Sequence, residues 1–169
     1  MKIYIIDDHA LFRNGLIALL ESRDISASAA SSPEQGLTEI PSLSVDIILL
    51  DLRMPQMSGL EVLKTLKADN ITTPVVMLTT STEENDLRDC LKNGAQGYLL
   101  KDMDPDELVN ALNEAMSGSI VVAQDMTHIL AKVLRNELTD NEPSFDSLTN
   151  REKEVACQVS SGYSNKVIA

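Results

Sequence analysis

Tryptophan is absent from this sequence of 169 residues, which holds only two phenylalanines and three tyrosines. The core must therefore be built from aliphatic side chains and methionine, which favours strands rich in isoleucine, leucine and valine. The two cysteines, Cys90 and Cys157, are far apart, with no Cys-x-x-Cys pair and no clustered histidine. Neither a disulfide framework nor a zinc site is indicated, and we expect a reducing compartment.

Positive charge is also scarce, with 14 lysines and arginines against 26 aspartates and glutamates and a net charge of −12. This balance disfavours nonspecific binding of the whole chain to nucleic acid or anionic membrane, so any DNA contact must be local. The N-terminus "MKIYIIDDHALF" lacks the apolar region of a signal peptide, and no stretch approaches the roughly 18 apolar residues of a membrane span. We therefore expect a cytoplasmic protein with no membrane partner.

Short apolar runs alternate with amphipathic segments over the first two thirds of the chain. The expected strands are residues 2–6, 25–30, 45–51, 74–78 and 97–100, and the expected helices are residues 11–22, 33–40, 59–69, 83–94 and 105–118. Such alternation is typical of a parallel sheet covered by helices on both faces. The sequence thus predicts an α/β fold with a five-stranded, doubly wound parallel sheet. Gly94 and Gly118 fall where left-handed helix caps are needed.

The rest of the chain divides into a linker and the start of another unit. Residues 124–138 show the apolar spacing of a helix, and the polar segment that contains Pro143 marks a boundary. A capping box formed by Thr149 and Glu152 then opens a new helix. We predict a first domain over residues 1–118, a linker over 119–147 with a helix at about 124–138, and the start of an all-α domain over 148–169.

Polar residues stand at the carboxyl ends of four predicted strands, where an open parallel α/β sheet binds its ligand. They are the carboxylates Asp7, Asp8 and Asp51, the hydroxyl of Thr79 and the ammonium of Lys101. Adjacent carboxylates near an apolar core repel each other, so a cation is expected between them. The set suits a hard divalent cation with oxygen ligands, and an anion held between that cation and the lysine.

Two other polar residues near these strands are left out of the predicted site. Asp46 begins the strand that Asp51 ends, and five residues at about 3.3 Å each separate the two by roughly 16 Å. His9 follows the carboxylate pair, but a loop residue beside a metal site is the simpler interpretation. We assign His9 no catalytic role.

The sequence resembles a known family at these positions. The Asp7-Asp8 pair, "DLRMPQMSGLE" from Asp51, Thr79 and "GYLLKD" around Lys101 resemble the receiver domain of two-component response regulators. The resemblance covers residues 1–118, and the intervals of 43, 28 and 22 residues between successive site residues from Asp8 to Lys101 match that family. The tail "LTNREKEVACQVSSGYSNKVIA" resembles the start of the LuxR-type helix-turn-helix of the NarL/FixJ family, and "GYLLKDMDPDELVNAL" is similar to its NarL branch.

The resemblance implies a flavodoxin-like receiver in which Asp51 accepts a phosphoryl group from a sensor histidine kinase. A carboxylate that attacks phosphorus acts as a nucleophile, and Mg²⁺ assists by neutralising phosphoryl oxygens. By the same resemblance, the metal ligands are Asp8, Asp51 and the backbone carbonyl of Arg53, with Asp7 binding directly or through water. Mg²⁺ is the one cofactor that the resemblance implies.

The resemblance also assigns the phosphoryl-binding groups and a switch. Thr79 and Lys101 bind the phosphoryl group, and Thr79 and Tyr98 form the switch. The role of Thr79 depends on strand register, since Thr80 and Ser81 are alternative hydroxyl donors. Taken without the resemblance, Tyr98 is expected as a half-buried strand aromatic.

We therefore predict a regulator that pairs into a homodimer when phosphorylated and binds promoter DNA through its C-terminal domain. Two departures from the family appear: Asp102 follows Lys101 where many receivers have a cis proline, and only 23 residues run from Ser147 to Ala169. Those 23 residues lack the recognition helix of a helix-turn-helix domain. The sequence leaves open whether it ends there or continues. Nitrate or nitrite is suggested as the stimulus by the NarL-like segment.

Two other functions are considered. One is a stand-alone receiver that acts through protein contacts only. The other is a Mg²⁺-dependent phosphatase of the haloacid dehalogenase type, which also uses an aspartate nucleophile. That family needs an acid two residues after the nucleophile, where this chain has Arg53. We therefore expect no enzymatic turnover beyond phosphoryl transfer to Asp51 and its own dephosphorylation.

Overall fold

The structure is a computed structural model that describes residues 1–140, with side chains through residue 138. The predicted start of a helix-turn-helix domain at residues 148–169 lies outside the described residues. Residues Met1–Leu130 form one compact unit. Its strands are β1 (Lys2–Ile6), β2 (Ser26–Ala30), β3 (Ile47–Leu50), β4 (Val75–Thr79), β5 (Gly97–Leu100) and β6 (Val121–Val122). Its α-helices are α1 (Ala10–Glu21), α2 (Pro33–Glu39), α3 (Gly59–Ala68), α4 (Glu84–Lys92) and α5 (Pro105–Met116).

The strands form one parallel sheet in the order β2-β1-β3-β4-β5-β6. This order belongs to the doubly wound, flavodoxin-like fold that was predicted, with a switch point between β1 and β3. The predicted number of five strands is wrong, because β6 pairs with β5 through Gly97 and Val121. β6 has only two residues and lies in a segment without alternating polar and apolar residues, so its sequence does not predict a strand. The sheet therefore includes residues that were expected in the linker.

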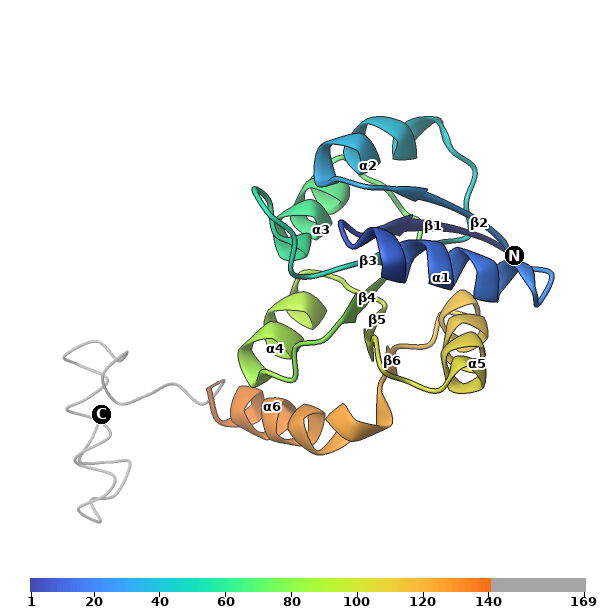
Figure 1. Cartoon of the computed structure of the whole chain (residues 1–169). Coiled ribbons are helices and arrows are strands. Elements are labelled where there is room, and N and C mark those ends of the chain that lie inside the picture. Colours follow the sequence, from blue (N-terminus) through green and yellow to red (C-terminus); the bar gives the residue numbers. More distant parts are fainter. Residues whose placement is uncertain (141–169) are drawn as a thin grey trace, which may run out of the picture. The chain divides into compact units, whose positions relative to one another are not determined.

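Alternate side chains of each strand pack into two separate cores. In β1, Ile3 and Ile5 face the core under α1 and α5, whereas Tyr4 and Ile6 face the core under α2, α3 and α4. Figure 1 shows the same division, with α1 and α5 on one side of the sheet and the other three helices opposite them. Because both faces are covered, the central strands β3 and β4 are apolar along their length, as expected of a parallel sheet.

Helix ends follow the signals in the sequence. Ser32 caps α2 by accepting a hydrogen bond from the Gln35 amide at 3.2 Å, and Asp104 caps α5 in the same way. Gly94 and Gly118 have φ angles of 90° and 93°, which confirms the left-handed conformation expected of them. These caps fix where α4 and α5 end, and hence where the next strands begin.

The helix expected at about 124–138 is present with shifted bounds. A 3₁₀ turn, η2 (Gln124–Met126), leads into α6 (Thr127–Asp140), and another 3₁₀ turn, η1 (Ile40–Ser42), follows α2. The predicted division at residues 118, 147 and 148 stays a prediction. Within residues 1–140, no helix is long and apolar enough to cross a membrane.

Candidate functional site

The predicted site residues stand where four neighbouring strands end. Asp7 and Asp8 follow β1, Asp51 follows β3, Thr79 is the last residue of β4, and Lys101 follows β5. Ile6 pairs with Leu50 in the parallel register of β1 and β3. The residues that directly follow these two, Asp7 and Asp51, therefore lie side by side. The order of the sheet thus brings groups from distant parts of the chain to one edge.

Lys101 bridges two of the carboxylates. Its Nζ atom lies 2.7 Å from Oδ2 of Asp7 and 2.9 Å from Oδ2 of Asp51. Asp7 and Asp51 are almost fully buried, with 2% and 3% of their surface exposed. One ammonium therefore stands against several carboxylates in a site that excludes most water.

Burial and the contacts between Asp51 and Lys101 act in opposite directions on the pKa of each side chain. Burial raises the pKa of the Asp51 carboxyl, and the opposing effect of the hydrogen bond and charge of Lys101 is smaller. For Lys101, burial acts to lower the pKa, but the hydrogen bonds to Asp7 and Asp51 outweigh it and leave the pKa raised. The lysine therefore stays charged, and it only partly offsets the cost of an ionised Asp51.

Asp8 has an unsatisfied oxygen in this cluster. No hydrogen-bond partner among the described residues reaches its buried Oδ1 atom, although Nδ1 of His9 lies 3.2 Å away. One possible ligand atom from each of Asp7, Asp8, His9 and Asp51 lies within 4.8 Å of the others. Buried carboxylates in excess of their lysine, with an orphaned oxygen among them, fit a divalent cation.

Thr79 and Tyr98 are both bonded to the backbone of Ser81. Thr79 is fully buried, and its Oγ1 accepts a hydrogen bond from the Ser81 amide at 3.1 Å. Tyr98 is fully buried as well, with its hydroxyl donating to the Ser81 carbonyl at 3.0 Å. The expectation of a half-buried Tyr98 is therefore wrong. The ring lies on the α4 side of the sheet, in a core that includes Leu87 and Cys90 of that helix.

Arg53 meets the site through its backbone. Its amide donates to Oδ1 of Asp51 at 3.3 Å, while its guanidinium leaves the site and pairs with Asp86 of α4. Ser81 also donates its hydroxyl to Asp86. The side chain that stands two residues after Asp51 is thus tied to α4 and does not contact the acidic cluster.

Two further residues support the site and were missed by the sequence analysis. Nζ of Lys101 lies 4.7 Å from the ring centroid of Phe12, and the Arg13 guanidinium donates to the Asp7 carbonyl at 2.6 Å. Both belong to the first turn of α1. Their signal was present in the sequence, since the helix starts directly after the carboxylate pair and Phe12 is one of only two phenylalanines.

The peptide bond that follows Lys101 is trans.

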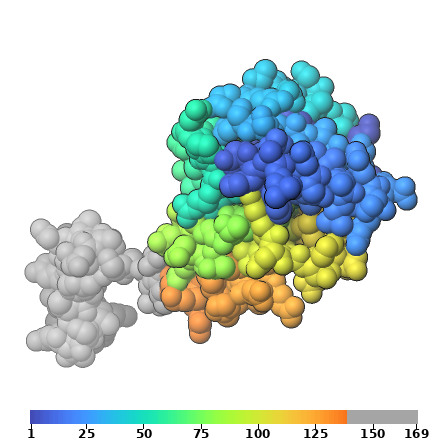
Figure 2. All heavy atoms as spheres, viewed as in Figure 1, coloured from blue at the N-terminus to red at the C-terminus, as the bar shows by residue number. Residues whose placement is uncertain are grey.

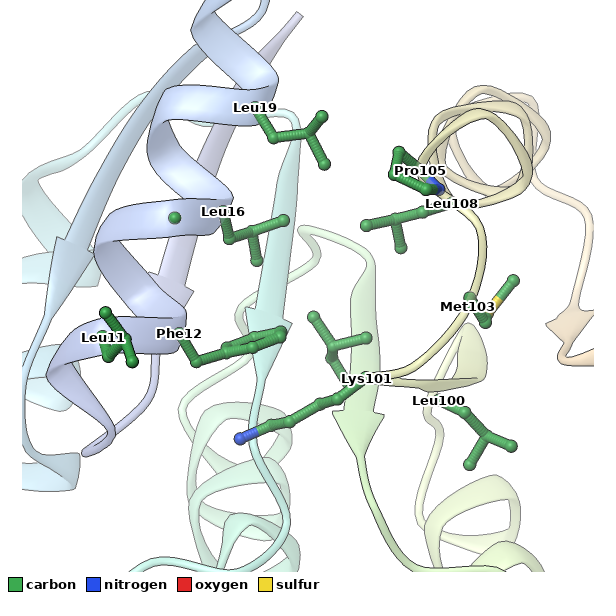
Figure 3. Close-up of a pocket in the computed structure, with 11 residues that line it drawn as sticks. Leu11, Phe12, Leu16, Leu19, Leu100, Lys101, Met103, Pro105 and Leu108 are labelled. Atoms are coloured by element: carbon green, nitrogen blue, oxygen red, sulfur yellow. The ribbon is translucent and has the colours of Figure 1, made fainter.

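The site opens into a cavity of about 360 Å³. Its lining residues are His9, Leu11, Phe12, Asp51, Arg53, Thr80 and Lys101. A second, apolar cavity of about 230 Å³ runs between α1 and the segment from Lys101 to Leu108. Figure 3 shows Leu16 and Leu19 pointing across it toward Leu108, with Lys101 reaching from β5 toward the start of α1. In the space-filling view α1, in dark blue, adjoins the yellow segment that carries α5 (Figure 2).

The Response regulator receiver domain family matches residues 3–113. The nitrate/nitrite response regulator protein NarL of Escherichia coli strain K12 is 40% identical over 169 residues, which cover 99% of this chain and 78% of NarL. NarP of the same strain, also a nitrate/nitrite response regulator protein, is 37% identical over 171 residues, which cover 99% of this chain and 78% of NarP.

The solved structures that resemble this protein include other response regulators. The receiver domain of the putative response regulator NarL from Mycobacterium tuberculosis has a TM-score of 0.64 and 31% identity, covering 69% of this chain and 96% of that one. A two-component response regulator of the LuxR family from Aurantimonas sp. SI85-9A1 has a TM-score of 0.73 and 25% identity, covering 78% and 95%. With the receiver domain matched from residue 3 to 113, this chain belongs to the two-component response regulators, in the NarL/FixJ family whose members include NarL and NarP.

Proposed function

We propose that Asp51 is the phosphoryl acceptor of this response regulator and that a sensor histidine kinase is the donor. One observation carries the proposal: Asp51 is buried at the carboxyl end of β3, bonded to Lys101 and flanked by Asp7, yet it lines the open cavity. A carboxylate that is held rigidly, kept from bulk water and still reachable from one side has what a nucleophile toward phosphorus needs.

In the transfer, a carboxylate oxygen of Asp51 forms a bond to phosphorus. The phosphorus–nitrogen bond to the kinase histidine breaks, and its electron pair stays on the imidazole nitrogen, which takes up a proton. Burial contributes because it leaves the ionised Asp51 carboxylate poorly solvated, so little water has to be removed before the attack.

Mg²⁺ is the proposed cofactor. Asp7, Asp8, Asp51 and the backbone carbonyl of Arg53 would hold it, and the orphaned Oδ1 of Asp8 supports a ligand role for that residue. Bound there, Mg²⁺ neutralises negative charge on the phosphoryl oxygens. Asp7 binds Lys101 through Oδ2 and accepts from the His9 amide through Oδ1, so its carboxylate is already oriented by two partners.

Lys101 and Thr79 are the proposed phosphoryl-binding groups. Lys101 already contacts Asp51, and its ammonium is held between carboxylates on one side and the Phe12 ring on the other. Thr79 has a hydroxyl proton to give, because its Oγ1 serves only as an acceptor for Ser81 in the hydrogen bonds described. When Thr79 turns to the phosphoryl group, the Ser81 amide loses that acceptor. This would move the loop to which Tyr98 is bonded, so we keep Thr79 and Tyr98 as the proposed switch.

The apolar cavity beside the site is the proposed contact for the kinase. Leu11, at the start of α1, is 90% exposed and lines both cavities. A partner that brings a phosphohistidine into the cavity over Asp51 would cover this leucine, and that burial would stabilise the encounter. Figure 3 shows Leu11, Phe12, Leu16 and Leu19 following one another along α1 beside the apolar cavity.

The proposed output is control of promoter DNA binding by a C-terminal helix-turn-helix domain, with the phosphorylated chains pairing as homodimers in the cytoplasm. The support is the likeness to NarL over 99% of this chain, a share that takes in most of residues 148–169. NarL and NarP are by name nitrate/nitrite response regulators, so nitrate and nitrite are the first stimuli to test with this protein.

The experiment is incubation with acetyl phosphate and Mg²⁺, followed by intact mass measurement. The wild type should gain one phosphoryl group, and Asp51→Asn should gain none. Asp46→Asn is the matched control, because Asp46 lies at the opposite end of β3, where its Oδ2 accepts a hydrogen bond from the Lys2 amide at 2.7 Å. A phosphoryl adduct that persists in Asp51→Asn would refute the assignment.

A further inference from the structure

His9 places an imidazole nitrogen inside the acidic cluster. Its Nδ1 atom lies 3.2 Å from Oδ1 of Asp8, 3.5 Å from Oδ1 of Asp7 and 3.8 Å from Oδ2 of Asp51. These residues come from the carboxyl ends of β1 and β3. His9 offers an imidazole nitrogen, and the other three offer carboxylate oxygens. A group of three carboxylates with one imidazole differs in chemistry from an all-oxygen site.

The side chain of His9 serves neither helix capping nor core packing. His9 is the N-cap residue of α1, but its ring makes no capping hydrogen bond, and only its backbone serves the helix. The backbone amide is bonded to Oδ1 of Asp7 at 2.8 Å, which fixes the start of the side chain beside the carboxylates. The ring is 64% exposed, so its burial in a core does not account for its place either.

The distances fit ligands that share one metal ion. Two ligand atoms bound at about 2.0 to 2.2 Å to a tetrahedral ion are about 3.3 to 3.6 Å apart. The separation from the His9 nitrogen to Asp7, 3.5 Å, lies in this range, that to Asp8, 3.2 Å, lies just below it, and that to Asp51, 3.8 Å, lies 0.2 Å above it. The orphaned oxygen of Asp8 belongs to the closest of these pairs, so an ion would satisfy both atoms at once.

We propose that His9 is a nitrogen ligand that opens this site to divalent ions of the zinc class. Mg²⁺ selects oxygen ligands, whereas Zn²⁺ and Co²⁺ bind imidazole and carboxylate together. His9 thereby raises the affinity for zinc-class ions while leaving that for Mg²⁺ nearly unchanged. The inference rests on the metal site of the proposed function and adds a residue that decides which ion occupies it.

The choice of ion has a consequence for phosphoryl transfer. A zinc-class ion with four protein ligands resembles a closed structural site, with no free position for an oxygen of the incoming phosphoryl group. With Mg²⁺, the same site lacks the imidazole ligand and keeps positions for water or substrate oxygens. His9 therefore makes the zinc-loaded receiver slower to accept a phosphoryl group than the Mg²⁺-loaded receiver.

The test compares Mg²⁺ and Zn²⁺ binding by titration calorimetry in wild type and His9→Asn. Asparagine retains a polar side chain of similar reach but removes the imidazole. We expect Zn²⁺ affinity to fall by about tenfold or more, because an imidazole ligand is lost, and Mg²⁺ affinity to change by less than about twofold. His128→Ala is the matched control, because it removes the only other histidine, which is exposed on α6.

A second readout reports ligation directly. Zn²⁺ should shift the imidazole nitrogen resonances of His9 in the wild type and leave those of His128 in place. Co²⁺ should give a visible absorption spectrum that changes in His9→Asn and does not change in His128→Ala.

Equal Zn²⁺ affinity in wild type and His9→Asn would overturn the inference. It would also be overturned if the affinities for Mg²⁺ and Zn²⁺ change by the same factor, because His9 would then act only through charge or packing. Phosphorylation of Asp51 with Mg²⁺ is measured separately, so the proposed function can hold while the role of His9 fails. If the wild type bound neither Mg²⁺ nor Zn²⁺, the metal site itself would be refuted.

Discussion

Gly59 packs directly against the backbone of Asp51. A Cβ atom built on Gly59 would lie 2.1 Å from the Asp51 carbonyl oxygen, and the Gly59 amide donates to the Leu52 carbonyl at 2.9 Å. The first residue of α3 thus holds the loop that follows β3. Glycine is required there because any side chain would push the acceptor loop away.

Gly59→Ala is expected to destabilise the protein by about 1 to 3 kcal/mol, because a backbone atom cannot yield as a side chain can. It should also weaken Mg²⁺ binding, since the displaced loop carries Asp51. The control is Gly15→Ala in α1, where no heavy atom lies within 4 Å of the added Cβ. That change should stabilise the protein by about 0.5 to 1 kcal/mol. Chemical denaturation measures both, and equal effects of the two changes would contradict the packing argument.

Cys90 should be inert toward thiol reagents in the folded protein. Burial raises the pKa of its thiol to about 12, and the charges of Asp86 and Asp89 add to the effect. The reactive thiolate is therefore scarce at pH 8. A Cys157→Ser variant isolates Cys90, and we expect labelling by Ellman's reagent only on unfolding. Labelling in buffer as fast as in denaturant would contradict this expectation.

The stability of the metal-free protein should depend on pH through Asp51. Burial raises the pKa of this carboxyl in the folded state. Its contribution to stability is therefore present below the unfolded pKa of about 3.9 and is lost as pH rises through the folded pKa. Lys101 stays charged in this range, because its pKa is raised too.

Denaturation curves in the presence of a chelator test this dependence. Relative to wild type, Asp51→Asn should gain stability as pH rises through the folded pKa of Asp51, because the variant carries no charge to bury. The gain should shrink when Mg²⁺ is added to both proteins, since the ion stabilises the wild-type carboxylate. Parallel curves for the two proteins without metal would show that Asp51 is not the group responsible.

Tyr98→Phe tests the hydroxyl without disturbing the core. The ring stays buried, but the Ser81 carbonyl loses its donor, which should cost about 1 kcal/mol. Beryllofluoride, a phosphoryl mimic, should still bind with Mg²⁺, because the hydroxyl contacts the loop and not the carboxylates. Fluorine magnetic resonance detects that binding. A variant that loses the mimic would show that Tyr98 supports the acceptor site itself.

Phosphorylation is expected to drive dimer formation. Beryllofluoride and Mg²⁺ should increase the sedimentation coefficient of the wild type and leave Asp51→Asn unchanged. The reason is that an altered α4–β5–α5 face can shift the equilibrium only if it binds a partner more tightly than the resting face does. If the mimic binds and the protein remains monomeric, the homodimer proposal fails.

The sequence by itself determined the alternation of strands and helices, the helix caps and the acceptor edge. Parallel strands buried on both faces must be apolar throughout, so β3 and β4 can be recognised in the sequence as apolar runs. The first polar residues at the carboxyl ends of such runs mark the edge of the sheet. Asp7, Asp51 and Lys101 were therefore predictable as neighbours, and their contacts at 2.7 and 2.9 Å confirm it. The left-handed caps predicted at Gly94 and Gly118 were equally local.

Only the tertiary structure decided what depends on contacts between distant segments. β6 is too short to have a pattern and exists because β5 offers it an open edge. Tyr98 is buried because α4 covers its face of the sheet, which no property of residues 97–100 reveals. The nitrogen of His9 could turn to water or to the carboxylates, and in the structure it lies toward the carboxylates, 3.8 Å from Oδ2 of Asp51 at the end of β3. In each case the contacting group lies on another strand or helix, so the local sequence does not reveal it.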